Sequence, residues 1–219
     1  MPTREPTSAA QRRRSRQVVP AVRPEAGDIG PRARRTVDRI LDATREVFMT
    51  KGYFGTTIDE IAQAAGVSRA SFYTYFPTRR DVLLAVGSNA AGEMQVLIDA
   101  YPEYGATRAG VRQWLALCIE QLDRNGPFAM AWPVAAMNDE EIRRAGMRRQ
   151  SVLSRNLGRA ILASGGRTIE DPEPVGLVVM AMMERVWRYG ELYREAVDRD
   201  AVIAQMANAV WGLARQPAH

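Results

Sequence analysis

Polar side chains gather in a short stretch that begins at Ser68 and leads into an aromatic run ending at Phe76. Ser68 and Ser71 carry hydroxyls that donate and accept hydrogen bonds, and Arg69 carries a guanidinium that can donate two hydrogen bonds to one guanine edge. Such a contact discriminates that base by roughly 1–3 kcal/mol. Groups suited to phosphate contacts flank these three residues, namely Thr56, Thr57, Tyr73, Thr74, Tyr75 and Arg79. The chemistry indicated is recognition of double-stranded DNA.

The sequence contains few residues suited to catalysis or metal binding. The one histidine is the terminal His219 and the one cysteine is Cys118, so internal residues cannot assemble a Ser–His–Asp triad or a Cys/His zinc cluster. No glycine-rich phosphate loop or paired-acid motif stands out. We therefore expect no catalytic residues, no metal and no cofactor, and we expect that the protein is not an enzyme.

Two short helices joined by a glycine turn must position the polar side chains. Thr57, followed by Glu60 three residues later, forms a capping-box pattern that predicts the start of a helix. Gly66 ends that helix, and Ser68 is placed to cap a further helix over 69–75. This order is typical of a helix-turn-helix, whose second helix enters the major groove of DNA. Phe72 and Phe76 are expected to anchor that second helix to the core.

The chain divides by composition into a basic segment that we expect to be disordered (1–30), a helix-turn-helix domain (31–77) and a larger helical domain (78–219). No segment alternates with a two-residue period, so the expected fold class is all-α. Gly52 is expected to end the first helix and Pro102 the fourth. Later helices are expected over 107–124, 127–137, 139–164, 172–196 and 200–214.

Positive charge is concentrated at the N-terminal end. Residues 1–35 hold nine arginines against three acidic residues, whereas residues 81–219 hold fifteen basic residues against seventeen acidic ones. The run from Arg12 to Arg16 could lie along phosphates or in a minor groove, or the basic segment could serve solubility alone. No stretch approaches the roughly 20 apolar residues that span a bilayer, so we expect a cytoplasmic protein with no membrane partner.

The segments Thr56–Ala62 and Ala65–Arg79 closely resemble the signature of the TetR family of transcriptional regulators, and the similarity extends over about 39–84. Departures are small, since the family often has histidine where Tyr75 stands and lysine where Arg79 stands. Both replacements keep a hydrogen-bond donor.

The resemblance implies a homodimer of nine or ten helices per subunit, in which the last two helices of each subunit pair. Dimers of this motif read half-sites about one helical turn or more apart, so the implied partner is a palindromic operator. Residues 78–219 would then be a ligand-binding and dimerisation domain whose effector shifts the fourth helix and releases DNA. The segments 76–84 and 182–192 are similar to an actinobacterial branch with narrow lipophilic tunnels, which includes the ethionamide-resistance repressor.

Methionines and tryptophans of the larger domain are either core residues or the lining of a hydrophobic pocket. For a small lipophilic effector, the pocket candidates are Trp114, Phe128, Trp132, Met183 and Trp187. An apolar stripe on the last helix is expected at the dimer interface, and comprises Val202, Met206, Ala209, Val210 and Leu213. Glu184 and Arg185 form either an internal ion pair or a solvated one. Four arginines form either an exposed helical face or a site for an acidic head group, namely Arg143, Arg144, Arg148 and Arg149.

An alternative function is a helical module that senses a lipid or a protein partner, with incidental DNA binding. The basic segment and the Met-rich interior permit it, whereas the recognition helix favours the regulator. For the regulator, Arg69→Ala is expected to relax sequence preference and Arg79→Ala to weaken binding to all sequences alike.

Overall fold

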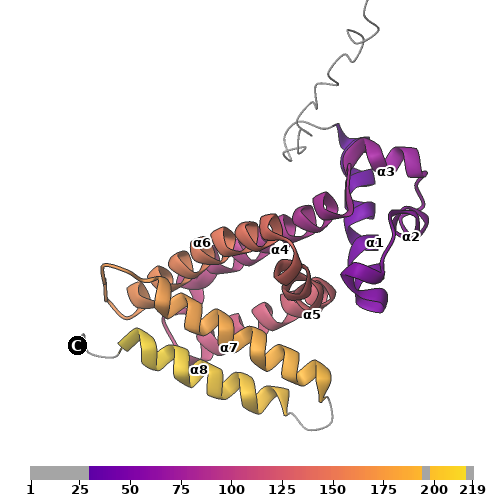
Figure 1. The fold of residues 1–219 in the computed structure, drawn as a ribbon. Coiled ribbons are helices and arrows are strands. Elements are labelled where there is room, and N and C mark those ends of the chain that lie inside the picture. Colours follow the sequence, from indigo (N-terminus) through magenta and orange to yellow (C-terminus); the bar gives the residue numbers. More distant parts are fainter. Residues whose placement is uncertain (1–29, 194–197, 216–219) are drawn as a thin grey trace, which may run out of the picture.

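The computed structural model describes residues 30–193 and 198–215, which form helices joined by short turns with no β-strand among them (Figure 1). This confirms the all-α fold class. The helices are α1 (Pro31–Gly55), α2 (Ile58–Ala64), α3 (Arg69–Tyr75), α4 (Arg79–Tyr104), α5 (Arg108–Asn138), α6 (Glu140–Ser164), α7 (Glu173–Leu192) and α8 (Arg199–Arg215). The basic residues Arg12–Arg16 and the terminal His219 lie outside the described ranges.

Helices α1, α2 and α3 gather at one end of the molecule (Figure 1). Each contributes a fully buried side chain to a common core, namely Ile40, Ile61 and Phe72, and this core continues into α4 at Leu83. α1 bends at Gly52, whose φ of +68° confirms the special backbone position predicted there. The chain then resumes a last helical turn to Gly55 instead of ending at the bend.

The other helices build a larger body, in which α6 and α7 lie side by side and α8 packs against α5 (Figure 1). Its core includes the buried rings of Tyr101 and Trp114, which meet edge to face with centroids 4.9 Å apart. Within the described ranges, no helix combines the length and the apolarity needed to cross a membrane.

Two further expected helix boundaries were wrong. Pro102 lies inside α4. Its ring removes one backbone donor, but the helix continues because Tyr101 stays packed in the core and its carbonyl accepts a bond from the N–H of Gly105 (2.8 Å). α5 is one helix across Gly126, where two had been expected. A Cβ added to Gly126 would lie 2.3 Å from Cζ2 of Trp187, so this glycine allows close packing and does not stop the helix.

Candidate nucleic-acid interface

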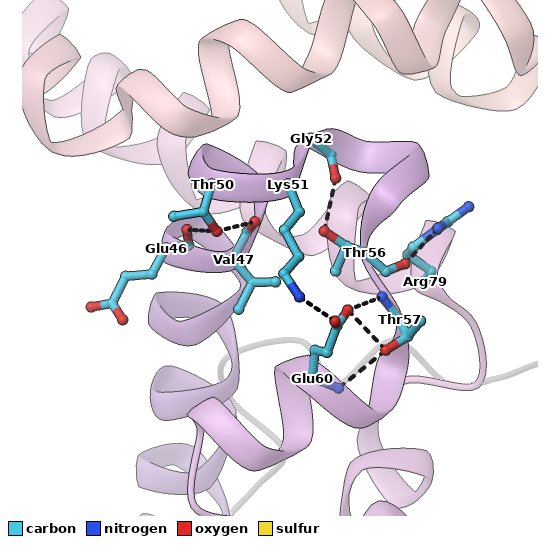
Figure 2. A network of polar contacts seen from close by, with 9 residues as sticks. All are labelled: Glu46, Val47, Thr50, Lys51, Gly52, Thr56, Thr57, Glu60 and Arg79. Carbon is cyan, nitrogen blue, oxygen red and sulfur yellow. Dashed lines mark hydrogen bonds and ion pairs between the residues drawn. The ribbon is translucent and has the colours of Figure 1, made fainter.

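α2 begins with the capping box that the sequence predicts (Figure 2). The N–H of Thr57 donates to Oε2 of Glu60 (2.8 Å), and the N–H of Glu60 donates to Oγ1 of Thr57 (3.3 Å). Lys51 in α1 donates to the same carboxylate. These bonds, with that of Lys51 first, lower the pKa of Glu60 from 4.5 to about 2. The charged carboxylate therefore fastens the start of α2 to α1.

A tight turn connects α2 to α3. Gly66 has a φ of +63°, which residues with a Cβ rarely adopt, and the N–H of Val67 returns to the carbonyl of Ala62 (3.0 Å). Oγ of Ser68 then accepts from the N–H of Ser71 (3.1 Å), which confirms Ser68 as the N-cap of α3. α3 spans Arg69–Tyr75, as predicted.

α3 has one buried side and one exposed side. Phe72 and Phe76 are buried with ring centroids 5.8 Å apart, which confirms that they anchor the helix. The predicted DNA-contacting residues divide into an exposed set, Ser68, Arg69, Tyr73 and Thr74, and a half-buried set, Ser71 and Tyr75. α3 therefore presents its first turn and one polar side to a partner.

Arg69 is held at the exposed start of α3 by groups on both helices. Its Nη1 donates to Oδ1 of Asp59 in α2 (2.6 Å), and its Nη2 donates to the hydroxyl of Tyr73 (3.3 Å). The attraction of Asp59 is the main cause that raises the pKa of Arg69. Sequence reasoning missed Asp59, although a carboxylate in the first turn of α2 was a signal that could have been used.

Thr56 and Arg79, expected at phosphates, instead lie in contacts within the protein (Figure 2). Thr56 is 1% exposed, and its hydroxyl donates to the carbonyl of Gly52 (2.7 Å). Nη1 of Arg79 donates to the carbonyls of Thr56 (2.6 Å) and Phe54 (3.2 Å), and the guanidinium lies 4.5 Å from the ring centre of Tyr53. The two side chains thus fasten the α1–α2 loop to the start of α4. The neighbouring Thr57 is exposed.

A polar groove lies between the start of α1 and α3. Arg32 and Arg39 line it from α1, and Ser71 and Tyr75 line it from α3. Sequence reasoning missed the two arginines, which are seven residues apart and therefore share one face of α1. They bring positive charge beside the exposed side of α3.

The α2–turn–α3 unit and its neighbours match a known family. The model for bacterial regulatory proteins of the tetR family matches residues 40–86, which run from α1 into α4. Residues 40–86 are therefore similar to the tetR family of bacterial regulatory proteins. The matched residues include the two helices and the turn of the helix-turn-helix described above.

Curated proteins similar to this chain are HTH-type transcriptional regulators. The uncharacterized HTH-type transcriptional regulator TtgW of Pseudomonas putida is 35% identical over 91 residues, which are 42% of this chain and 63% of that protein. SrpR of Pseudomonas putida is also 35% identical over 91 residues, which are 40% of its length. The chain thus matches less than two thirds of the length of either relative.

Solved structures extend the likeness of fold to the C-terminal helices. A putative TetR-family regulator from Mesorhizobium loti has a TM-score of 0.66 at 19% identity, over 83% of this chain and 96% of that one. The fatty acid degradation regulator FadR from Bacillus halodurans has a TM-score of 0.64 at 19% identity, over 84% of this chain and 96% of that one. Identities this low concern the fold alone.

Beyond residues 40–86, a cavity of about 230 Å³ lies among α4, α5, α6 and α7. Phe128, Trp132 and Met183 line it, as predicted. Trp114 and Trp187 were expected to line it but are not among its walls. Both are buried core residues whose indole N–H groups are already bonded, to the carbonyl of Leu97 (2.7 Å) and to Oδ1 of Asp123 (2.9 Å).

The walls of the cavity also carry charged side chains. Glu184 lines it from α7 and pairs with Arg188 one turn later, whereas Arg185 is exposed and lies 5.9 Å from the ring centre of Tyr189. Neither pairing considered for Glu184 and Arg185 is therefore found. Of the α6 arginines Arg143, Arg144, Arg148 and Arg149, only Arg149 lines the cavity.

The apolar stripe of α8 faces mainly inward. Met206 and Val210 are 3% and 0% exposed and pack in the core of their own subunit, so they offer little surface to the dimer interface expected there. Val202 and Leu213 are partly buried, and Ala209 is exposed. Sequence reasoning missed exposed apolar residues on α7, namely Leu177, Val178, Tyr189 and Leu192.

Proposed function

We propose that the protein is a homodimeric transcriptional repressor that binds a palindromic operator and is released by a small lipophilic effector. The observation that carries this proposal is the Ser68-capped α3, which exposes Arg69 and Tyr73 while Phe72 holds it to the core. The role is regulatory, without catalysis.

The proposed division of work within α3 follows exposure. Ser68, Arg69 and Ser71 at its first turn contact base edges in the major groove. Phosphates are contacted by groups beside this turn, namely the exposed Thr57, Tyr73 and Thr74 and the half-buried Tyr75. Arg79 and Thr56 act indirectly, because their bonds hold the α1–α2 loop that presents α2.

The proposed dimer interface lies on the outward sides of α7 and α8. Exposed apolar residues at 177, 178, 189 and 192 recur at helical spacing on α7, and such a stripe favours a partner helix. On α8, Ala209 with the outer parts of Val202 and Leu213 would complete it. A two-fold axis through this surface would give two recognition helices and hence a palindromic site.

The effector site is the cavity, which supports control through α4. Gly87 of α4 lies against the rings of Phe128 and Trp132, and all three line the cavity. α4 begins at Arg79, within the bonds that hold the helix-turn-helix. A ligand that moves these rings would therefore displace α4. We also propose that the protein belongs to the actinobacterial branch with lipophilic tunnels.

Selection from a random duplex library tests the proposal. The protein should enrich a palindrome at moderate salt and bind it as a dimer by native mass spectrometry. Enrichment of no sequence, with retention of a lipid or protein partner instead, would favour a helical sensor module and overturn the repressor.

A further inference from the structure

Arg149 joins the cavity to the helix that leads to the DNA-binding domain. It projects from α6, and its Nη2 donates to Oγ of Ser88 (2.6 Å) while its Nη1 donates to the carbonyl of Leu84 (3.3 Å), both in α4. The same side chain lines the cavity. One guanidinium thus contacts both the ligand space and the N-terminal half of α4.

The neighbourhood of Arg149 is suited to an anionic head group. Gln150, the next residue of α6, also lines the cavity and has an amide that can donate. The acidic wall residue Glu184 is paired with Arg188, so its charge is compensated. The other walls are largely apolar, with Met94, Phe128 and Trp132 among them. The site therefore has a cationic end, two buried amide side chains at Gln121 and Asn125, and otherwise mainly apolar walls.

Cavity size limits the ligand. An engineered protein cavity of about 150 Å³ holds benzene, so by proportion about 230 Å³ holds about nine non-hydrogen atoms. A carboxylate accepts two parallel hydrogen bonds from a guanidinium, which is the pairing that this group forms most strongly.

We propose that the effector is a small lipophilic carboxylate whose head group takes Arg149 away from Ser88 and Leu84. This inference rests on the proposed function, since it specifies the ligand of the effector cavity. Transfer of the guanidinium from a hydroxyl and a carbonyl to a carboxylate removes two hydrogen bonds between α6 and the N-terminal half of α4, while the bond of Asn156 to Gln95 still holds the C-terminal half. α4 then shifts and carries Arg79, with the helix-turn-helix, out of register with the operator.

Calorimetry with heptanoate and with heptanamide tests the ligand class, because the two probes have equal size and differ in charge. Wild-type protein should bind heptanoate about tenfold or more tightly than heptanamide, as expected for a charge-assisted bidentate contact. Arg149→Gln should bring the two affinities within about threefold of each other. Arg148→Gln is the matched control, because Arg148 is exposed and does not line the cavity.

A second variant tests the proposal even if the Arg149→Gln protein does not fold. Ser88→Ala removes a competing acceptor from an exposed helix position, so heptanoate should bind more tightly while heptanamide binding is unchanged. Equal binding of the two probes by all four proteins would overturn the carboxylate and leave the effector cavity in place. Failure of both probes to bind would overturn the inference, and operator titration of the same samples would report separately on the repressor.

Discussion

Arg69 at the start of α3 donates to the carboxylate of Asp59 in α2, with 2.6 Å between Nη1 and Oδ1, and the pair bridges the two helices of the helix-turn-helix. Both side chains are about 60% exposed, so water screens the pair. A guanine edge that takes the guanidinium must compete with Asp59. The ion pair therefore orients Arg69 and at the same time restrains it.

Asp59→Asn should raise the affinity for operator DNA by up to about fivefold. The gain is limited to about fivefold because an exposed ion pair is weak, and it arises because that pair no longer has to break when Arg69 turns to DNA. Fluorescence anisotropy with labelled operator measures the change. In an Arg69→Ala background the same substitution should give a smaller gain, and an equal gain would show that Asp59 acts without Arg69.

Arg79→Ala should lower the free energy of unfolding by about 1–3 kcal/mol, because it removes the donor to the carbonyls of Thr56 and Phe54. Urea denaturation measures this. Arg80→Ala is the control, because the Arg80 side chain is 42% exposed and its ion pairs to Asp139 and Glu141 should contribute less than ~1 kcal/mol. If Arg79→Ala left the stability unchanged and weakened binding to all DNA, Arg79 would contact a phosphate instead of holding the loop.

Glu60 should make stability depend on pH. Its pKa is about 2 in the folded protein against an ordinary value of 4.5, with the bond from Lys51 as the main cause. A depressed pKa contributes stability that is present above pH 4.5 and is lost as pH falls towards 2. The melting temperature of wild type should therefore exceed that of Glu60→Gln at neutral pH, and the gap should narrow below pH 4.5. A gap that stayed constant with pH would contradict this.

Gly87 and Gly92 in α4 form a matched pair. Gly92→Ala has open space around the new Cβ and should stabilise by about 0.5–1 kcal/mol. Gly87→Ala places a Cβ 2.8 Å from Phe128 and 2.9 Å from Trp132, so the stabilisation should be lost and ligand binding should weaken as these rings move into the cavity. Thermal denaturation of both variants measures this difference in stability. Equal stabilisation by the two substitutions would argue against tight packing at Gly87.

Local signals made the DNA-binding domain predictable from sequence. Thr57 with Glu60, the φ-positive Gly66 and the cap at Ser68 each act within a few residues, and all were found as expected. The helix ends predicted at Gly126 and Pro102 were wrong because residues distant in the sequence determine whether the helix continues there. Trp187 packs on Gly126, and Trp114 packs on Tyr101, in the turn that contains Pro102.

Periodicity reveals that a face is apolar but not what it contacts. Met206 and Val210 fit the stripe expected at an interface, yet their partners are in the same subunit. Trp114 and Trp187 likewise fit a pocket by type, whereas their indole N–H groups found bonds in the core. The bonds of Arg79 were not foreseen for the same reason, because its long side chain reaches carbonyls 23 and 25 residues away in the sequence.

The central claim is that the first turn of α3 reads DNA sequence, and anisotropy titration of Arg69→Ala tests it most directly. The selected operator and a duplex of scrambled sequence are titrated at several salt concentrations, with Arg159→Ala on the distant α6 as the charge-matched control. The account predicts a loss of about 1–3 kcal/mol on the operator, with the scrambled duplex little changed, for Arg69→Ala alone. Equal losses on both duplexes, or none on either, would contradict it.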